Sequence, residues 1–227
     1  LANSLNIPAV KVLRDLSTAA FIAQLKRAQF ATVQKQAEDL GLSLILGGCG
    51  VTLEELTRLF AAFGQEGQLR PIRWVSETPS ADTASAGEAL LSAEAAFLIT
   101  NVLTQVTRPD LPTQFENTYR LPKIAWKTGT SYGKRDAWSI GYNHRFTIGV
   151  WVGNFSGEGV PDLSGAHTAT PLLFELFNTL DYNAPKGWFL PPSQVGLRKV
   201  CAESGLLPDE FCTNQITDYH IVGISPY

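Results

Sequence analysis

The amino-acid sequence predicts an α+β fold in which helices pack on an antiparallel sheet. Apolar residues recur at helical spacing through the first half of the 227-residue chain. Short runs of aromatic and β-branched residues follow Arg108, and one more helical pattern comes after them. Helices followed by short strands and a further helix are typical of layered α+β domains.

Local signals mark where the predicted helices begin and end. The spacing predicts helices over residues 7–16, 21–28, 52–63 and 94–106. Pro8 falls in the first turn of the first helix, where a missing N–H costs little. Thr52 and Glu55 form a capping box, Gly64 ends that helix, and Ser92 is the expected cap of the fourth. The Pro-, Ser-, Thr- and Asp-rich residues 72–86 predict a loop.

The second half of the domain is expected to form the sheet. Strands are predicted over residues 123–130, 137–142 and 146–153. Asn143 and His144 separate the last two strands, which suits a tight hairpin. A final helix is expected over residues 170–180, with Pro171 in its first turn.

The chain is predicted to divide into one partial domain and the start of another. Residues 183–192 contain three prolines and indicate a linker. The 35 residues beyond it are too few for a core of their own. We therefore expect a domain over residues 1–183, and a linker with the truncated start of an extension over residues 184–227. The chain lacks methionine and begins at Leu1, so we expect it to be a piece of a longer polypeptide.

Composition argues against several classes of function. The net charge of −3 leaves no basic surplus for phosphates, so nucleic acid is not an expected partner. The longest uncharged run, residues 40–53, has 14 residues, whereas a membrane-spanning helix needs about 18 or more. The start of the chain shows no secretory signal. The three histidines are scattered, and we expect neither a metal site nor a cofactor.

The three cysteines separate into one lone residue and one candidate pair. Cys49 lies in an apolar, glycine-rich stretch and is expected to act as a small buried hydrophobe. Ten residues, rich in turn formers, lie between Cys201 and Cys212. A disulfide there would staple a short segment and would imply an oxidising compartment. Zinc is a poorer alternative, because His220 is the only further candidate ligand nearby.

Two short motifs are candidates for chemistry. Ser4-Leu5-Asn6 is an S-x-N triplet, and Lys127-Thr128-Gly129 is a K-T-G triplet at the end of a predicted strand. A glycine in that strand lets a peptide backbone approach closely and pair with the strand edge. The lysine supplies a positive charge for a carboxylate, and Thr128 and Thr130 supply hydroxyl donors. The Thr130 N–H could stabilise an oxyanion. The alternative is a strand that simply ends in a polar turn.

The motifs and their surroundings resemble the transpeptidase domain of class A, bifunctional penicillin-binding proteins. The matching segments, in chain order, are residues 4–10, 126–131, 135–138, 141–142 and 149–154. In the tail, Cys201, Ser204-Gly205, Pro208 and Cys212 resemble the start of the C-terminal extension of one branch of that family. The resemblance implies a serine β-lactamase-like fold, incomplete at its N-terminus.

The resemblance also implies a role for each motif residue. The family runs serine acyl transfer with three motifs, S-x-x-K, S-x-N and K-T-G. Ser4 would relay a proton, Asn6 would hydrogen-bond the donor peptide, and Lys127 would keep Ser4 poised. Thr128 and Thr130 would bind the carboxylate of acyl-D-Ala-D-Ala or of a β-lactam, with Gly129 allowing the close approach.

The sequence departs from the family pattern at the nucleophile. S-x-x-K precedes S-x-N in this family, and no such motif precedes Ser4 in this sequence. Ser131-Tyr132-Gly133-Lys134 matches literally, but it follows the K-T-G strand instead of starting a helix. Thr32-Val33-Gln34-Lys35 has a threonine and the wrong order. We therefore expect the chain alone to be inactive.

The expected function is that of a fragment of a peptidoglycan D,D-transpeptidase. Its expected partners are stem peptides and β-lactams, with cell-wall proteins as possible partners of the extension. The resemblance implies a longer protein with an upstream membrane anchor and glycosyltransferase domain, at the periplasmic face of the inner membrane. The alternatives are a non-catalytic peptide- or protein-binding module and a β-lactamase-like hydrolase.

Overall fold

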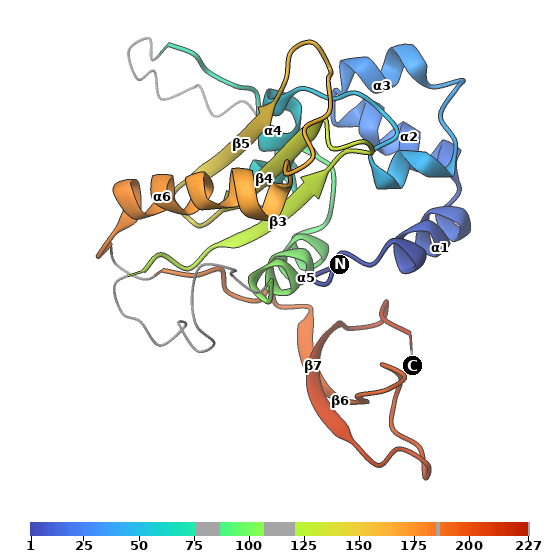
Figure 1. Ribbon diagram of the computed structural model, residues 1–227. Coiled ribbons are helices and arrows are strands. Elements are labelled where there is room, and N and C mark those ends of the chain that lie inside the picture. The colour runs from blue at the N-terminus through green and yellow to red at the C-terminus, as the bar shows by residue number, and fades with distance from the viewer. Residues whose placement is uncertain (76–86, 107–120, 185–186, 227) are drawn as a thin grey trace.

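The computed structural model describes residues 1–75, 87–106, 121–184 and 187–226, and its secondary structure follows the predicted α+β order (Figure 1). The helices are α1 (Asn6–Leu16), α2 (Thr18–Arg27), α3 (Ala31–Gln36), the 3₁₀ helix η1 (Leu42–Leu46), α4 (Leu53–Phe63), α5 (Ala93–Thr104), the π-helical turn η3 (Gly165–Ala169) and α6 (Thr170–Asp181). The strands are β1 (Gln68–Leu69), β2 (Glu88–Ala89), β3 (Ala125–Thr130), β4 (Asp136–Tyr142), β5 (Thr147–Gly153), β6 (Val195–Cys201) and β7 (Gln215–Ile221).

The central sheet is antiparallel, with the strand order β3-β4-β5. Its register pairs Gly129 with Trp138, and Trp138 with Trp151. The turn between β4 and β5 is closed by Asn143, whose side-chain oxygen accepts from the backbone N–H groups of Arg145 and Phe146. The predicted hairpin is therefore present, with residues 143–146 between the strands, one more than the predicted strand bounds leave.

Alternate residues of the strands serve two separate hydrophobic cores, because successive side chains point to opposite faces of a sheet. On one face, Trp126 packs edge-on against Phe174 of α6, with ring centroids 4.9 Å apart, and Phe177 is fully buried. On the other face, Tyr142 is fully buried and meets Phe60 of α4. Figure 1 shows α6 and α4 on opposite sides of the sheet.

The helix ends follow the sequence signals, whereas several short elements do not. Thr52 and Glu55 form the capping box of α4, and Ser92 accepts from the Ala95 N–H at the start of α5. The sequence analysis did not predict α3, η1 or the two-residue strands β1 and β2. These elements are too short to show a period of their own. Residues of α3 and η1 form a third core together with α2. Of the predicted loop over residues 72–86, residues 76–86 lie outside the described part.

The C-terminal residues form a β6–β7 hairpin, which was also not predicted. Tyr219 of β7 packs edge-on against Phe97 of α5, with ring centroids 5.2 Å apart. Within the predicted linker, of which residues 185–186 are not described, Trp188 and Phe189 pack against the core around Tyr142. Trp188 and Phe189 therefore anchor the segment between α6 and the β6–β7 hairpin to the central sheet.

The core around Tyr142 is expected to lose stability at alkaline pH. Thr100 donates to the Ala96 carbonyl, so the Tyr142 hydroxyl donates to Thr100 at 2.7 Å. Burial raises the pKa of Tyr142 above its usual value, because the phenolate would lose its hydration in the core. The unfolded chain releases this proton above about pH 10 while the folded chain retains it, so stability falls as pH rises through that range.

We expect Tyr142→Phe to lower the free energy of unfolding by about 1 kcal/mol at neutral pH, because one buried hydrogen bond is lost. Above about pH 10 the difference in the free energy of unfolding between the two proteins should narrow. The wild type loses stability there because of its phenol, and the variant has no phenol to titrate. Urea unfolding at a series of pH values measures both effects. A gap that stays constant or widens with pH would contradict this assignment.

Within the described residues, no helix combines the length and apolar character needed to cross a bilayer.

Candidate active site

The S-x-N and K-T-G motifs meet in the folded chain. Ser4 lies just before α1, and Lys127 lies in β3, 123 positions further along the chain. The Lys127 ammonium donates to the Ser4 hydroxyl, and it also donates to the Thr128 carbonyl at 2.9 Å. Asn6, the third residue of the S-x-N motif, is exposed and begins α1 two residues after Ser4.

A tight turn presents the Ser4 hydroxyl to Lys127. The Ser4 N–H donates to the Leu1 carbonyl at 3.1 Å, and Ser4 has a φ of 53°, in the left-handed region that non-glycine residues rarely adopt. Helix α1 begins directly afterwards and is anchored by Leu13, which is 1 % exposed. The serine therefore sits on a short turn whose direction is fixed by a packed helix.

Burial changes the acid–base behaviour of Lys127. Desolvation lowers the pKa of this lysine below its usual value, because a half-buried ammonium has lost part of its hydration. A lysine with a lowered pKa gives up its proton more readily. The pair of Lys127 and Ser4 can therefore exchange a proton along an existing hydrogen bond.

The K-T-G strand lies at an edge of the central sheet. In the described part of the chain β3 pairs with β4 alone, so its other edge carries backbone groups free to pair with an extended peptide. A Cβ atom at Gly129 would lie 3.5 Å from the Trp138 Cβ, which is an ordinary van der Waals contact. Lys127 and Gly129 share one face of the strand, and Thr128 and Thr130 share the other.

Thr130 is held by a residue that the sequence analysis missed. Its hydroxyl oxygen accepts from the backbone N–H of Gly165 at 3.0 Å. Gly165 begins η3, directly before α6, and two buried hydroxyl groups, of Ser139 and Thr170, lie behind it. The nearest sequence signal was Pro171, which marked the first turn of the predicted helix and did not point to Gly165.

The literal S-x-x-K match has a structural role. The Ser131 hydroxyl oxygen accepts from the backbone N–H groups of Arg135 and Asp136, at 3.2 and 2.8 Å. The Lys134 ammonium donates to the Pro161 carbonyl. Both side chains are therefore engaged in fixing the β3–β4 turn and the loop that follows β5.

The cysteines lie apart from the motifs. Cys201 and Cys212 are joined by a disulfide, with Cα atoms 5.8 Å apart, at the loop end of the β6–β7 hairpin. Cys49 is half-buried beside the N-terminal core, where burial, and to a lesser extent the charge of Glu55, raises the pKa of its thiol. Among the described residues, no cluster of His, Cys, Asp or Glu side chains could hold a metal ion.

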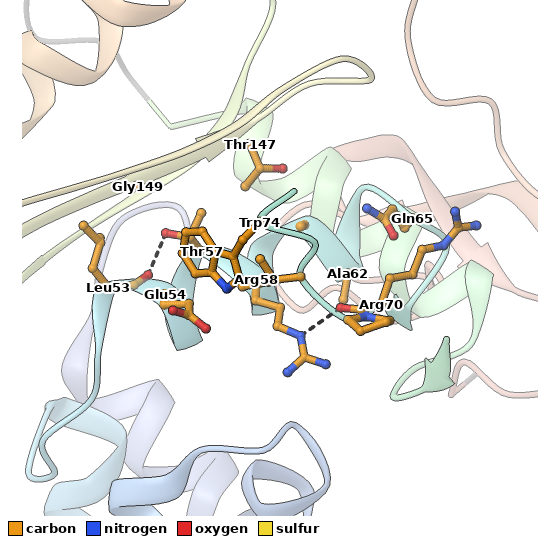
Figure 2. Close-up of a pocket in the computed structure, with 13 residues that line it drawn as sticks. Leu53, Glu54, Thr57, Arg58, Ala62, Gln65, Arg70, Trp74, Thr147 and Gly149 are labelled. Carbon is orange, nitrogen blue, oxygen red and sulfur yellow. Dashed lines mark hydrogen bonds between the residues drawn. The ribbon is translucent and has the colours of Figure 1, made fainter. Parts of the chain in front are cut away.

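A cavity of about 620 Å³ lies beside β5, the edge strand opposite to the K-T-G strand (Figure 2). Thr57 and Arg58 of α4, Trp74, and Thr147 and Gly149 of β5 contribute to its lining. Strand β4 separates β5 from the K-T-G strand, and none of the predicted site residues lines the cavity. The candidate active site is therefore the open edge of β3, not this cavity.

Comparison with known proteins identifies relatives of the whole chain. It is 37 % identical over 232 residues to penicillin-binding protein 1C of Escherichia coli (strain K12), a match that covers 100 % of this chain and 29 % of that protein. Penicillin-binding protein 4 of Bacillus subtilis (strain 168) is 28 % identical over 75 % of this chain and 28 % of its own length. The chain thus spans less than a third of these relatives. No family model matches it.

The fold has a counterpart among solved structures. Penicillin-binding protein 1A from Haemophilus influenzae superposes with a TM-score of 0.80 over 100 % of this chain and 40 % of that chain, at 20 % identity. PonA1 from Mycobacterium tuberculosis gives a TM-score of 0.52 over 67 % of this chain. These likenesses concern the fold. Together with the 37 % identity along its full length, they show that the chain belongs to the penicillin-binding protein family.

Proposed function

We propose that this chain supplies the S-x-N and K-T-G parts of the active site of a serine-type D,D-transpeptidase that crosslinks peptidoglycan. The observation that carries the proposal is the hydrogen bond between Lys127 and Ser4. A lysine with a lowered pKa in direct contact with a serine hydroxyl is a combination suited to relaying a proton during acyl transfer. Membership of the penicillin-binding protein family supports the same reaction class.

The proposed substrate is a stem peptide ending in D-Ala-D-Ala, with a β-lactam as its equivalent. The free edge of β3 supports pairing with an extended acyl donor. Lys127, Thr128 and Thr130 would bind its terminal carboxylate, and Gly129 would let the two backbones approach. Ser4 would pass a proton to the leaving group, and Asn6 would hydrogen-bond the peptide backbone.

The nucleophile is proposed to come from sequence upstream of Ser4. The relatives are more than three times as long as the matched segment. Helix α1 also exposes Ile7 and Val12, with 72 % and 66 % of their surface accessible, which supports a further segment packing on it. We infer that this segment carries a Ser-x-x-Lys with its serine at a helix start.

The wider setting is part of the same proposal. Residues 1–183 would belong to the transpeptidase domain, and residues 184–227 would lead into a C-terminal extension that contacts cell-wall proteins. The Cys201–Cys212 disulfide supports an oxidising compartment, in keeping with the periplasmic face of the inner membrane. The membrane anchor would lie upstream of this chain.

Covalent labelling with a fluorescent penicillin tests the proposal. The chain of residues 1–227 and a longer polypeptide that includes the upstream segment are compared side by side on denaturing gels. We expect the longer polypeptide to be labelled and the chain alone to remain unlabelled. Labelling of neither would favour a non-catalytic binding module, and rapid release of the label as hydrolysed penicillin would favour a β-lactamase-like hydrolase.

A further inference from the structure

A directed series of hydrogen bonds runs from the interior of the domain to the K-T-G strand. We propose that Ser139, Thr170 and Gly165 position the Thr130 hydroxyl so that its proton points at the carboxylate of the substrate. The three residues would act through Thr130 and would not touch the substrate themselves. This inference rests on the proposed function, because it assigns a purpose to residues behind the same site.

The series begins in the core between the sheet and α6. Ser139 of β4 and Thr170 at the start of α6 are both fully buried, and their hydroxyl oxygens lie 3.1 Å apart. Thr170 donates its single hydroxyl proton to the Gly165 carbonyl at 2.8 Å. The contact with Ser139 therefore uses a Thr170 lone pair, with Ser139 as the donor.

The series ends at Thr130. The Gly165 N–H donates to the Thr130 hydroxyl oxygen at 3.0 Å, which occupies one lone pair of that oxygen. The Thr130 proton must then point away from Gly165, and Thr130 is exposed at the end of β3. Ser139 thus donates to Thr170, Thr170 donates to the Gly165 carbonyl, and the Gly165 N–H donates to Thr130. The series ends at the strand edge where the carboxylate would bind.

Close packing fixes the position of Gly165 in this series. A Cβ atom there would lie 2.5 Å from the Gly129 carbonyl oxygen and 2.6 Å from the Trp138 carbonyl oxygen. Only glycine therefore allows η3 to touch the backbone of the K-T-G strand. The π-helical turn between Gly165 and Ala169 brings the N–H of Gly165 to Thr130 and its carbonyl to Thr170, and such turns occur frequently at functional sites.

Orientation of the Thr130 proton matters because the ligand group is an anion. A hydroxyl can donate only one hydrogen bond. If it is free to rotate, it donates that hydrogen bond to water for part of the time. A hydroxyl whose oxygen already accepts from a fixed N–H is held ready for the carboxylate, which lowers the cost of binding it. Loss of the series should therefore weaken recognition of the carboxylate in particular.

The test compares acylation by benzylpenicillin and by its methyl ester, which lacks the carboxylate. The longer polypeptide is used, with the second-order rate constant of acylation as the readout. We expect Thr170→Val to reduce the preference for benzylpenicillin over the ester by about five- to tenfold, and Thr170→Ser to restore it. Ser139→Ala, which keeps the Thr170–Gly165 contact, should give a smaller reduction in the same direction.

Thr100→Val is the matched control, because Thr100 is equally buried and hydroxyl-bonded but lies in the opposite core. Thr100→Val should change the rates of acylation by benzylpenicillin and by its methyl ester by the same factor, if it changes them at all. The preference for benzylpenicillin should therefore be preserved. If Thr170→Val and Ser139→Ala also preserve it, the positioning role is overturned while the proposed function stands. If the wild-type longer polypeptide is not acylated at all, the proposed function fails, and the inference fails with it.

A second measurement tests the hydrogen bond between the Gly165 N–H and the Thr130 hydroxyl in the absence of any ligand. The Gly165 amide of the 1–227 chain should exchange its proton faster in Thr130→Val than in the wild type, because its acceptor has been removed. Equal exchange rates in the two proteins would overturn the inference whatever the acylation results.

Discussion

Lys127→Ala is expected to reduce acylation of the longer polypeptide by a fluorescent penicillin by at least about 100-fold, the typical contribution of a positioned proton-transfer group. The substitution removes the donor to Ser4 and the positive charge proposed to attract the carboxylate. The fold should persist, because the Lys127 side chain is only partly buried and belongs to none of the hydrophobic cores. The rate of label incorporation, together with the circular dichroism spectrum, measures both expectations.

Lys134→Ala is the control for this experiment. Lys134 is also a lysine beside the K-T-G strand, but its ammonium donates to the Pro161 carbonyl in a neighbouring loop. The control should retain most of its labelling. Normal labelling of Lys127→Ala would exclude Lys127 from the site, and labelling lost equally in both variants would point to a general effect of charge.

Phe174→Ala is expected to lower the free energy of unfolding by about 3–5 kcal/mol, because it removes a large buried side chain and leaves a cavity. Phe174 is 2 % exposed and meets the ring of Trp126, the residue directly before Lys127. The effect of the cavity should therefore reach the K-T-G strand as well as the core. Urea unfolding of the 1–227 chain measures the loss of stability.

Leu172→Ala on the same helix is the comparison, since Leu172 is 44 % exposed. It should cost less than about 1 kcal/mol, within the range of surface substitutions. Similar losses for Phe174→Ala and Leu172→Ala would mean that α6 does not present the face to the sheet that the structure assigns to it.

The elements that could be predicted from sequence are those with a strong local signal. Thr52 and Glu55 cap α4 because the reciprocal hydrogen bonds need only residues three positions apart. The strands around Trp126 and Trp138 are likewise visible in the sequence, because they are short runs of aromatic and β-branched residues. The β6–β7 hairpin and η1 have no such signal, and they are stabilised by contacts with α5 and α1 that are distant in the sequence.

The candidate site divides in the same way. The S-x-N and K-T-G motifs name Ser4 and Lys127 by residue type and order, so resemblance to a known family was enough to select them. Gly165 and Thr170 belong to no motif. Their relation to Thr130 depends on a π-helical turn that touches a strand 35 residues earlier in the chain.

By itself, the sequence determined the longer helices and the three central strands, the two motifs and the family resemblance, because each depends on neighbouring residues or on their spacing. Tertiary structure alone decided that the Ser4 hydroxyl meets Lys127, and that burial lowers the pKa of that lysine. It also decided which way the Thr130 hydroxyl is held. Distances and desolvation depend on how distant segments pack, and no local pattern of residues records them.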